Sequence, residues 1–152
     1  MHEGAASAAL IIGVGNRLRG DDGVGPAVCD RLAERGFEAV EHAGDGAELM
    51  DLWQDRQRVF VVDATSTGAP AGTISRFEPR LEMMPRKTFF ASSHLFGLAE
   101  AVETSRALGR LPDGLVIYGV EGQSFAHGDA LFEDVAAAVA SVADQIATEA
   151  RR

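Results

Sequence analysis

The sequence predicts a three-layer α/β/α sandwich built on a mostly parallel, twisted sheet of about five strands. Three short apolar runs, Ala8–Val14, Val59–Val62 and Leu115–Val120, lack the polar alternation of a half-exposed strand. Such runs are typical of parallel strands that helices cover on both faces. Helical patterns separate the runs, and no repeat, linker or low-complexity tract interrupts the 152 residues. We therefore expect a single domain over residues 1–152.

The first half of the chain is predicted to hold three strands and two helices. A glycine-rich loop follows the first strand and leads into a helix over residues 26–35, where Pro26 suits the first turn. Val24, Val28 and Leu32 share one face of that helix, and Gly36 ends it. The other elements of this half are a strand over residues 37–42, a short helix over residues 48–54 and a strand over residues 59–62.

The second half is predicted to hold two strands and two helices. A Pro/Gly turn precedes a strand over residues 72–77, and residues 115–120 form a fully apolar strand. Ser92 and Ser93 are suitable caps for a helix that starts at His94 and runs to about Leu108. The last helix, over residues 132–150, ends in two arginines that suit the negative end of its dipole. Residues 81–87 match no regular element.

Composition excludes several classes of function. Lys+Arg 14 against Asp+Glu 23 gives a formal charge of −9, and no basic cluster opposes it. We therefore expect no nucleic-acid partner. The apolar run at residues 8–12 is too short to span a bilayer and has no basic leader, so we expect a cytoplasmic protein that does not bind membranes. The one cysteine, Cys29, allows no internal disulfide or Cys-rich zinc site and is expected in the core.

The glycine-rich loop, residues 13–25 (GVGNRLRGDDGVG), does not fit a nucleotide site. The third glycine of a dinucleotide-binding pattern would fall at Leu18. Asp21 and Asp22 stand where a pyrophosphate needs neutral amides and a positive helix end. No Gly-Lys-Ser/Thr sequence follows, which excludes a Walker-type loop.

Three polar residues are candidates to meet at the carboxyl-end edge of the sheet, where open α/β sheets bind their ligands. Asp22 lies in the glycine-rich loop, Asp63 ends the third strand, and His94 begins a helix whose positive end favours the neutral imidazole. Each also has an ordinary interpretation: a helix cap for Asp21 or Asp22, an Asx-type turn for Asp63, and packing under the sheet edge for His94. Together they offer two carboxylates and one imidazole, a ligand set that suits Ni, Zn, Mn or Fe(II).

The remaining polar candidates are weaker. Asn16 is expected to shape the loop. Glu121 ends the last strand at the same edge, and a solvated loop position is favoured over a place in a substrate groove. The other histidines, His2, His42 and His127, are expected at the surface. No Ser or Cys nucleophile has a recognisable histidine partner, and no His-Glu-x-x-His zinc motif is present.

The glycine-rich loop, read as Gly-x-Gly-Asn-x-Leu-x-x-Asp-Asp-Gly-x-Gly, resembles the opening signature of the hydrogenase maturation endopeptidases. The resemblance continues at residues 61–64 (VVDA), 92–98 (SSHLFGL) and 117–121 (IYGVE), with Phe125 beyond, and so runs over nearly the whole chain. These proteases trim the C-terminal extension from the large subunit of nickel–iron hydrogenases. The large-subunit precursor is therefore the partner that the resemblance implies.

The resemblance implies a catalytic, nickel-recognising site made of Asp22, Asp63 and His94. The first position is Glu or Asp in the family, and Asp21 is the alternative if the register shifts by one. The enzyme is then expected to recognise nickel already inserted in the precursor, so that cleavage follows only correct metal loading. Aspartic-type hydrolysis and metal-assisted hydrolysis both remain open at this point.

Two other functions fit the same residues. A non-catalytic nickel-binding maturation factor, or a checkpoint protein for the large subunit, would use the ligands without hydrolysis. A peptidase of related architecture would act on small or general substrates. A shortened C-terminus on nickel-loaded precursor excludes the first alternative, and cleavage of unrelated unfolded proteins favours the second.

Overall fold

A computed structural model describes residues 8–85, 88–90 and 96–152. Five strands form one sheet in the order β2-β1-β3-β5-β4. The strands are β1 (Leu10–Val14), β2 (Glu38–His42), β3 (Arg58–Thr65), β4 (Ile74–Phe77) and β5 (Gly114–Glu121). β2, β1, β3 and β5 are parallel, and β4 pairs antiparallel with β5 at the edge. The predicted fold class is confirmed.

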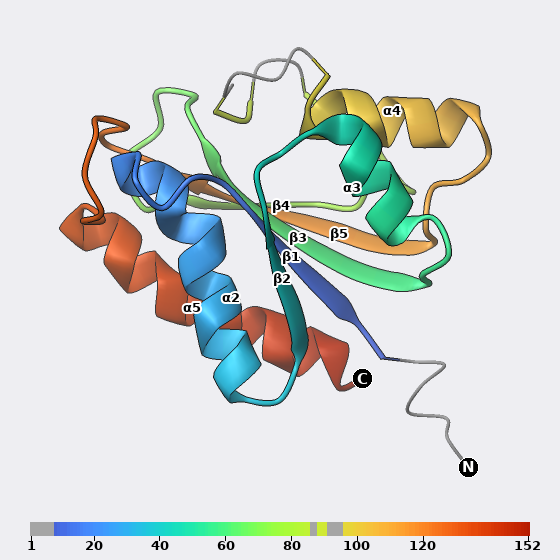
Figure 1. The fold of residues 1–152 in the computed structure, drawn as a ribbon, viewed down its shortest axis with the longest axis horizontal. Helices are drawn as coiled ribbons and strands as arrows, with labels where there is room; N and C mark the ends of the chain where they lie inside the picture. The colour runs from blue at the N-terminus through green and yellow to red at the C-terminus, as the bar shows by residue number, and fades with distance from the viewer. Residues whose placement is uncertain (1–7, 86–87, 91–95) are drawn as a thin grey trace.

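Helices cover both faces of the sheet (Figure 1). α2 (Val24–Glu34) and α5 (Glu133–Ala150) lie on one face, and α3 (Gly46–Trp53) and α4 (Leu98–Ala107) lie on the other. Alternate residues of each strand serve the two cores, so Phe60 and Val62 pack under α2 and α5 while Val59 and Val61 face α3 and α4. This double coverage explains why the central strands read as continuous apolar runs. None of the helices in the described ranges is long and apolar enough to cross a membrane.

Two element boundaries differ from the prediction at positions that matter for the site. β3 continues to Thr65, so Asp63 lies inside the strand and pairs with Gly119 of β5 rather than ending the strand. α4 begins at Leu98 rather than at His94, because Gly97 is its N-cap and the Glu100 side chain accepts a hydrogen bond from the Gly97 N–H at 2.9 Å. This side-chain cap from Glu100 fixes the start of the helix four residues after the predicted position.

The glycines of the loop allow a close crossing of chain segments. A Cβ atom on Gly25 would lie 2.5 Å from the Val14 carbonyl oxygen and 2.6 Å from the Val62 carbonyl oxygen. The start of α2 therefore rests directly on the carboxyl ends of β1 and β3. Gly15 has φ +145°, and a Cβ there would lie 1.9 Å from the carbonyl oxygen of Asp22. These contacts, rather than a phosphate, account for the glycine pattern.

Candidate functional site

The structure brings Asp22 and Asp63 together. Asp22 lies on η1 (Gly20–Gly23), a short 3₁₀ turn that packs against β3. Both side chains are buried, with 3% and 4% of their residue surface exposed. Burial raises the pKa of Asp63 well above its ordinary value, and the nearby charge of Asp22 raises it further. The two carboxyl groups are therefore electrostatic neighbours in a site that is largely shielded from water.

Each of these carboxyl groups has one oxygen without a donor among the described residues. Oδ2 of Asp22 accepts from the N–H of Asn16 at 2.8 Å, and Oδ1 of Asp63 accepts from the N–H of Ala64 at 2.8 Å. Burial also raises the pKa of Asp22, although the Asn16 N–H and the charge of Arg19 oppose this effect. Two buried carboxyl groups close enough to interact electrostatically are suited to sharing a proton or binding a cation.

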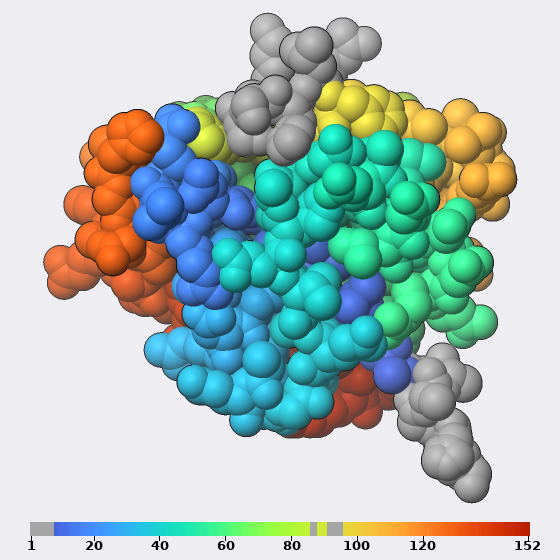
Figure 2. All heavy atoms as spheres, viewed as in Figure 1, coloured from blue at the N-terminus to red at the C-terminus, as the bar shows by residue number. Residues whose placement is uncertain are grey.

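Asp21, the alternative at the neighbouring position, has a structural role. Its Oδ2 accepts from the N–H groups of Gln123 at 2.7 Å and Ser124 at 3.0 Å, and its Oδ1 accepts from the N–H of Phe132 at 2.7 Å. One buried carboxylate thus holds both ends of the loop between β5 and α5. Figure 2 shows this loop (orange) lying against the β1–α2 segment (blue).

Neither aspartate caps the helix that follows it in the chain. The N-cap of η1 is Arg19 and the N-cap of α2 is Gly23, and neither position makes a side-chain capping hydrogen bond. The interpretation of Asp21 or Asp22 as a cap is therefore wrong. Asp21 bonds instead to amides that lie about a hundred residues later in the chain, which no local pattern reveals.

His94 lies outside the described residues, so its place in the predicted trio stays a prediction. The described residues 88–90 lie beside the end of β3. The N–H of Ser66 donates to the carbonyl of Thr88 at 3.0 Å, and the N–H of Phe90 donates to the carbonyl of Ala64 at 2.9 Å. Within the described part of the chain, no group of three His, Cys, Asp or Glu side chains is placed to hold a metal ion.

Glu121 is buried rather than solvated, which corrects the prediction. Its carboxylate accepts hydrogen bonds from the Thr65 hydroxyl at 2.8 Å, from the Thr67 hydroxyl at 2.8 Å, and from the N–H groups of Thr67 and Gly68 at 2.9 and 3.1 Å. Burial alone would raise the pKa of Glu121, but these hydrogen bonds outweigh it and lower the pKa. Glu121 thus anchors the loop that follows β3. The polar run Thr65-Ser66-Thr67-Gly68 after a buried strand was the signal for such an anchor.

The structure confirms the predictions for Asn16 and Cys29. Asn16 shapes the loop as predicted, since its Oδ1 accepts from the N–H of Leu18 at 2.8 Å. Cys29 lies in the core, and burial raises the pKa of its thiol to about 12.

Of the other histidines, His127 is exposed, as expected, whereas His2 lies outside the described residues. The surface prediction for His42 is wrong, because its side chain is only 12% exposed, its Nδ1 accepts from the Gly44 N–H, and its Nε2 lies 3.1 Å from Glu48.

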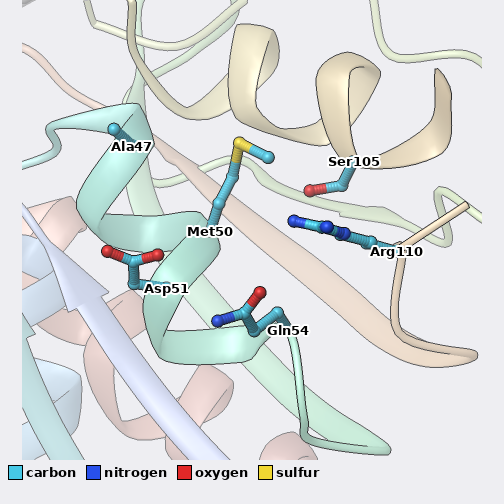
Figure 3. A pocket seen from close by; sticks show the side chains of 6 residues that line it. All are labelled: Ala47, Met50, Asp51, Gln54, Ser105 and Arg110. Atoms are coloured by element: carbon cyan, nitrogen blue, oxygen red, sulfur yellow. The ribbon is translucent and has the colours of Figure 1, made fainter. Parts of the chain in front are cut away.

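A separate cavity of about 180 Å³ lies between α3 and α4 (Figure 3). It contains none of the candidate residues Asp22, Asp63 or Glu121. The hydroxyl of Ser105 on its wall already accepts a hydrogen bond from Nε1 of Trp53 at 3.1 Å. The lining residues are Ala47, Met50, Asp51, Gln54, Ser105 and Arg110.

Comparison with known proteins agrees with this architecture. A family model described as hydrogenase maturation protease matches residues 30–149, a range that includes Asp63 and His94 but begins after the glycine-rich loop. A putative hydrogenase maturation protease of Methanocaldococcus jannaschii is 30% identical over 94% of this chain and 96% of its own length. The hydrogenase 2 maturation protease of Escherichia coli is 27% identical over 90% of this chain and 87% of its own length.

Solved structures share the fold. The [NiFe] hydrogenase maturation protease HybD from Thermococcus kodakarensis has a TM-score of 0.76 at 26% identity, covering 94% of this chain and 99% of that chain. HybD from Escherichia coli also gives 0.76, at 23% identity, covering 95% of this chain and 92% of that chain. With the family match over most of the sequence, these findings show that the chain belongs to the hydrogenase maturation protease family.

Proposed function

We propose that this protein is the endopeptidase that removes the C-terminal extension from the large-subunit precursor of a nickel–iron hydrogenase after nickel insertion. Membership of the maturation protease family supports a protease acting in hydrogenase maturation. The observation that carries the finer proposal is the buried Asp22–Asp63 pair, in which each carboxyl group has one oxygen that no described residue donates to.

The nickel in this proposal belongs to the substrate. The loaded precursor presents a cation to Asp22, Asp63 and His94, and these side chains complete its coordination and so fix the scissile bond beside them. An unloaded precursor supplies no positive charge to the two buried carboxyl groups, so it lacks the metal interaction that would place its scissile bond at the site.

Two sources of water activation fit the same pair. A carboxyl group with a raised pKa exchanges protons closer to neutral pH, which suits it to act as a general base. The nickel of the substrate can act instead as a Lewis acid. Both routes need Asp22 and Asp63 unsubstituted. Cys29 takes no part in either route, because its thiol is buried and protonated at neutral pH.

Mass spectrometry of the precursor C-terminus tests the proposal. Purified protein is incubated with nickel-loaded and nickel-free precursor in parallel. We expect loss of the extension only from the loaded form. Binding of loaded precursor without cleavage would instead support the non-catalytic maturation factor, and cleavage of an unrelated unfolded protein would support a general peptidase.

A further inference from the structure

We propose that Arg19 is a positioning residue of this site, which joins the turn carrying Asp22 to Phe90, whose backbone bonds to the strand that carries Asp63. The inference rests on the proposed function, because the residues that Arg19 positions are the proposed metal-recognising ligands. Arg19 itself is assigned no contact with the substrate.

The side chain of Arg19 contacts two aromatic residues from distant parts of the chain. Its Nε donates to the carbonyl oxygen of Phe125 at 3.0 Å, and its guanidinium carbon lies 6.0 Å from the centroid of the Phe90 ring. The rings of Phe90 and Phe125 stack with centroids 3.9 Å apart and an interplanar angle of 6°. One guanidinium group therefore holds a stacked pair together through a hydrogen bond on one member and a cation–π contact on the other.

The backbone connects this cluster to both aspartates. The carbonyl of Arg19 accepts from the N–H of Asp22 at 3.1 Å, so the two residues belong to the same turn. The N–H of Phe90 donates to the carbonyl of Ala64, the residue that follows Asp63. Phe125 lies in the loop between β5 and α5, which packs beside this turn in Figure 2. The cluster thus joins three segments at the edge of the sheet where Asp22 and Asp63 lie.

Arg17 provides a natural comparison within the same loop. Its guanidinium group bonds to Asp30 and Glu41 at the surface and does not contact the aromatic pair. Its side chain is 44% exposed, whereas Arg19 is half-buried. Removing either arginine changes the net charge of the loop equally, but only Arg19 joins the Asp22 turn to Phe90. A variant of Arg17 therefore controls for charge alone.

The effect of losing Arg19 is expected in catalysis rather than in folding. A misplacement of about 1 Å in a catalytic group can cost about a hundredfold in rate. Arg19→Met is therefore expected to lower kcat for nickel-loaded precursor by about 10- to 100-fold, with KM and Tm close to those of the unsubstituted protein. Arg17→Met is expected to keep kcat within about twofold. Arg19→Lys retains a cation but loses the planar donor, so it should restore only part of the rate.

A double-mutant cycle tests whether Arg19 acts through Phe90. If both residues serve one contact, the variant carrying Arg19→Met and Phe90→Leu together should lose no more activity than the more impaired single variant. Should Arg19→Met fail to fold, the same cycle is run with Arg19→Lys.

Four outcomes separate the claims. Unchanged kcat in the Arg19 variants, or losses from Arg19 and Phe90 that simply multiply, would overturn the positioning role. Equal losses in the Arg17 and Arg19 variants would overturn it as well, because loop charge would then explain the effect. If the unsubstituted protein leaves nickel-loaded precursor uncut, the proposed function fails, and the positioning role fails with it.

Discussion

The carboxylate of Asp22, on the turn before α2, acts on the carboxyl group of Asp63 inside β3 and raises its pKa beyond the effect of burial. The close crossing at Gly25 makes this relationship possible, because it places the start of α2 against the carbonyls of Val14 and Val62. The two acids come from motifs that are far apart in the sequence. Their encounter in a buried site is the structural basis of the proposed function.

Asp63→Asn should abolish processing and raise stability at neutral pH. The folded pKa of Asp63 lies above its ordinary value of 3.8, so the folded state binds the proton more tightly and loses stability as the pH rises past that value. Asparagine keeps the oxygen that accepts from Ala64 and removes the buried charge. We expect a Tm increase of about 2–6 °C at pH 7.5 in thermal denaturation.

The pH dependence is the control for this prediction. At pH 3.5, below the ordinary value of 3.8, the carboxyl group is mostly protonated in both states, so the advantage of Asp63→Asn should largely disappear there. An equal gain at pH 3.5 and pH 7.5 would mean that the buried charge is not its cause. Normal processing by the variant would leave Asp63 with only its turn-forming hydrogen bond to Ala64.

Asp21→Asn and Asp22→Asn should have opposite phenotypes. The Asp21 carboxylate accepts three backbone hydrogen bonds, and an amide nitrogen cannot accept any of them. We expect Asp21→Asn to lower the free energy of unfolding by about 2–4 kcal/mol in denaturant titrations. Asp22→Asn keeps an acceptor for Asn16 and removes a charge that burial disfavours, so it should be at least as stable as the unsubstituted protein at neutral pH and yet process precursor at least about a hundredfold more slowly.

These two variants together decide whether Asp22 or Asp21 is the acidic residue of the site. Each substitution changes one oxygen to nitrogen on adjacent buried residues, so differences in size or hydrophobicity are excluded. If Asp21→Asn were stable and inactive while Asp22→Asn remained active, Asp21 would be the acidic residue of the site.

Glu121→Gln should destabilise the loop after β3 in a pH-dependent way. The pKa of Glu121 is lowered from its ordinary value of 4.5, so its hydrogen bonds contribute stability above that pH, and the contribution is lost as the pH falls through the folded pKa. We expect the variant to be about 1–2 kcal/mol less stable at pH 7 and nearly equal in stability at low pH. Denaturant titrations at pH 7 and pH 3.5 measure this, and a constant difference would contradict it.

Cys29→Ala should process precursor within about twofold of the unsubstituted rate. The thiol is buried against Gly13 and the Val40 carbonyl, and its pKa of about 12 leaves little thiolate at neutral pH. The expected cost is in packing, about 1–2 kcal/mol of stability. A folded Cys29→Ala variant without activity would contradict the assignment and indicate a thiol mechanism.

The fold was largely predictable because apolar runs mark strands that are buried on both faces. The runs at Val59–Val62 and Leu115–Val120 identified β3 and β5. The end of β3 was misplaced because Asp63 is polar, whereas pairing with β5 carries the strand on to Thr65. The start of α4 was misplaced because two serines suggested a cap, whereas Gly97 and Glu100 form it.

The sequence predicted the residues of the site only where they lie at or near the carboxyl ends of strands. Asp22 follows β1, and Asp63 lies near the carboxyl end of the neighbouring parallel strand β3, so the order of the sheet brings them to one edge. The roles of Asp21, Glu121 and Arg19 depend on loops from distant parts of the chain. The partners of Asp21 at Gln123, and of Arg19 at Phe125, have no spacing pattern that a single sequence reveals.

The most direct test of the central claim is anomalous diffraction at the nickel edge from crystals of this protein grown with Ni²⁺. The account predicts one peak bound by carboxyl oxygens of Asp22 and Asp63 and by a ring nitrogen of His94, and no peak there in crystals of His94→Ala. A peak at other side chains, with the two aspartates left unligated, would contradict it.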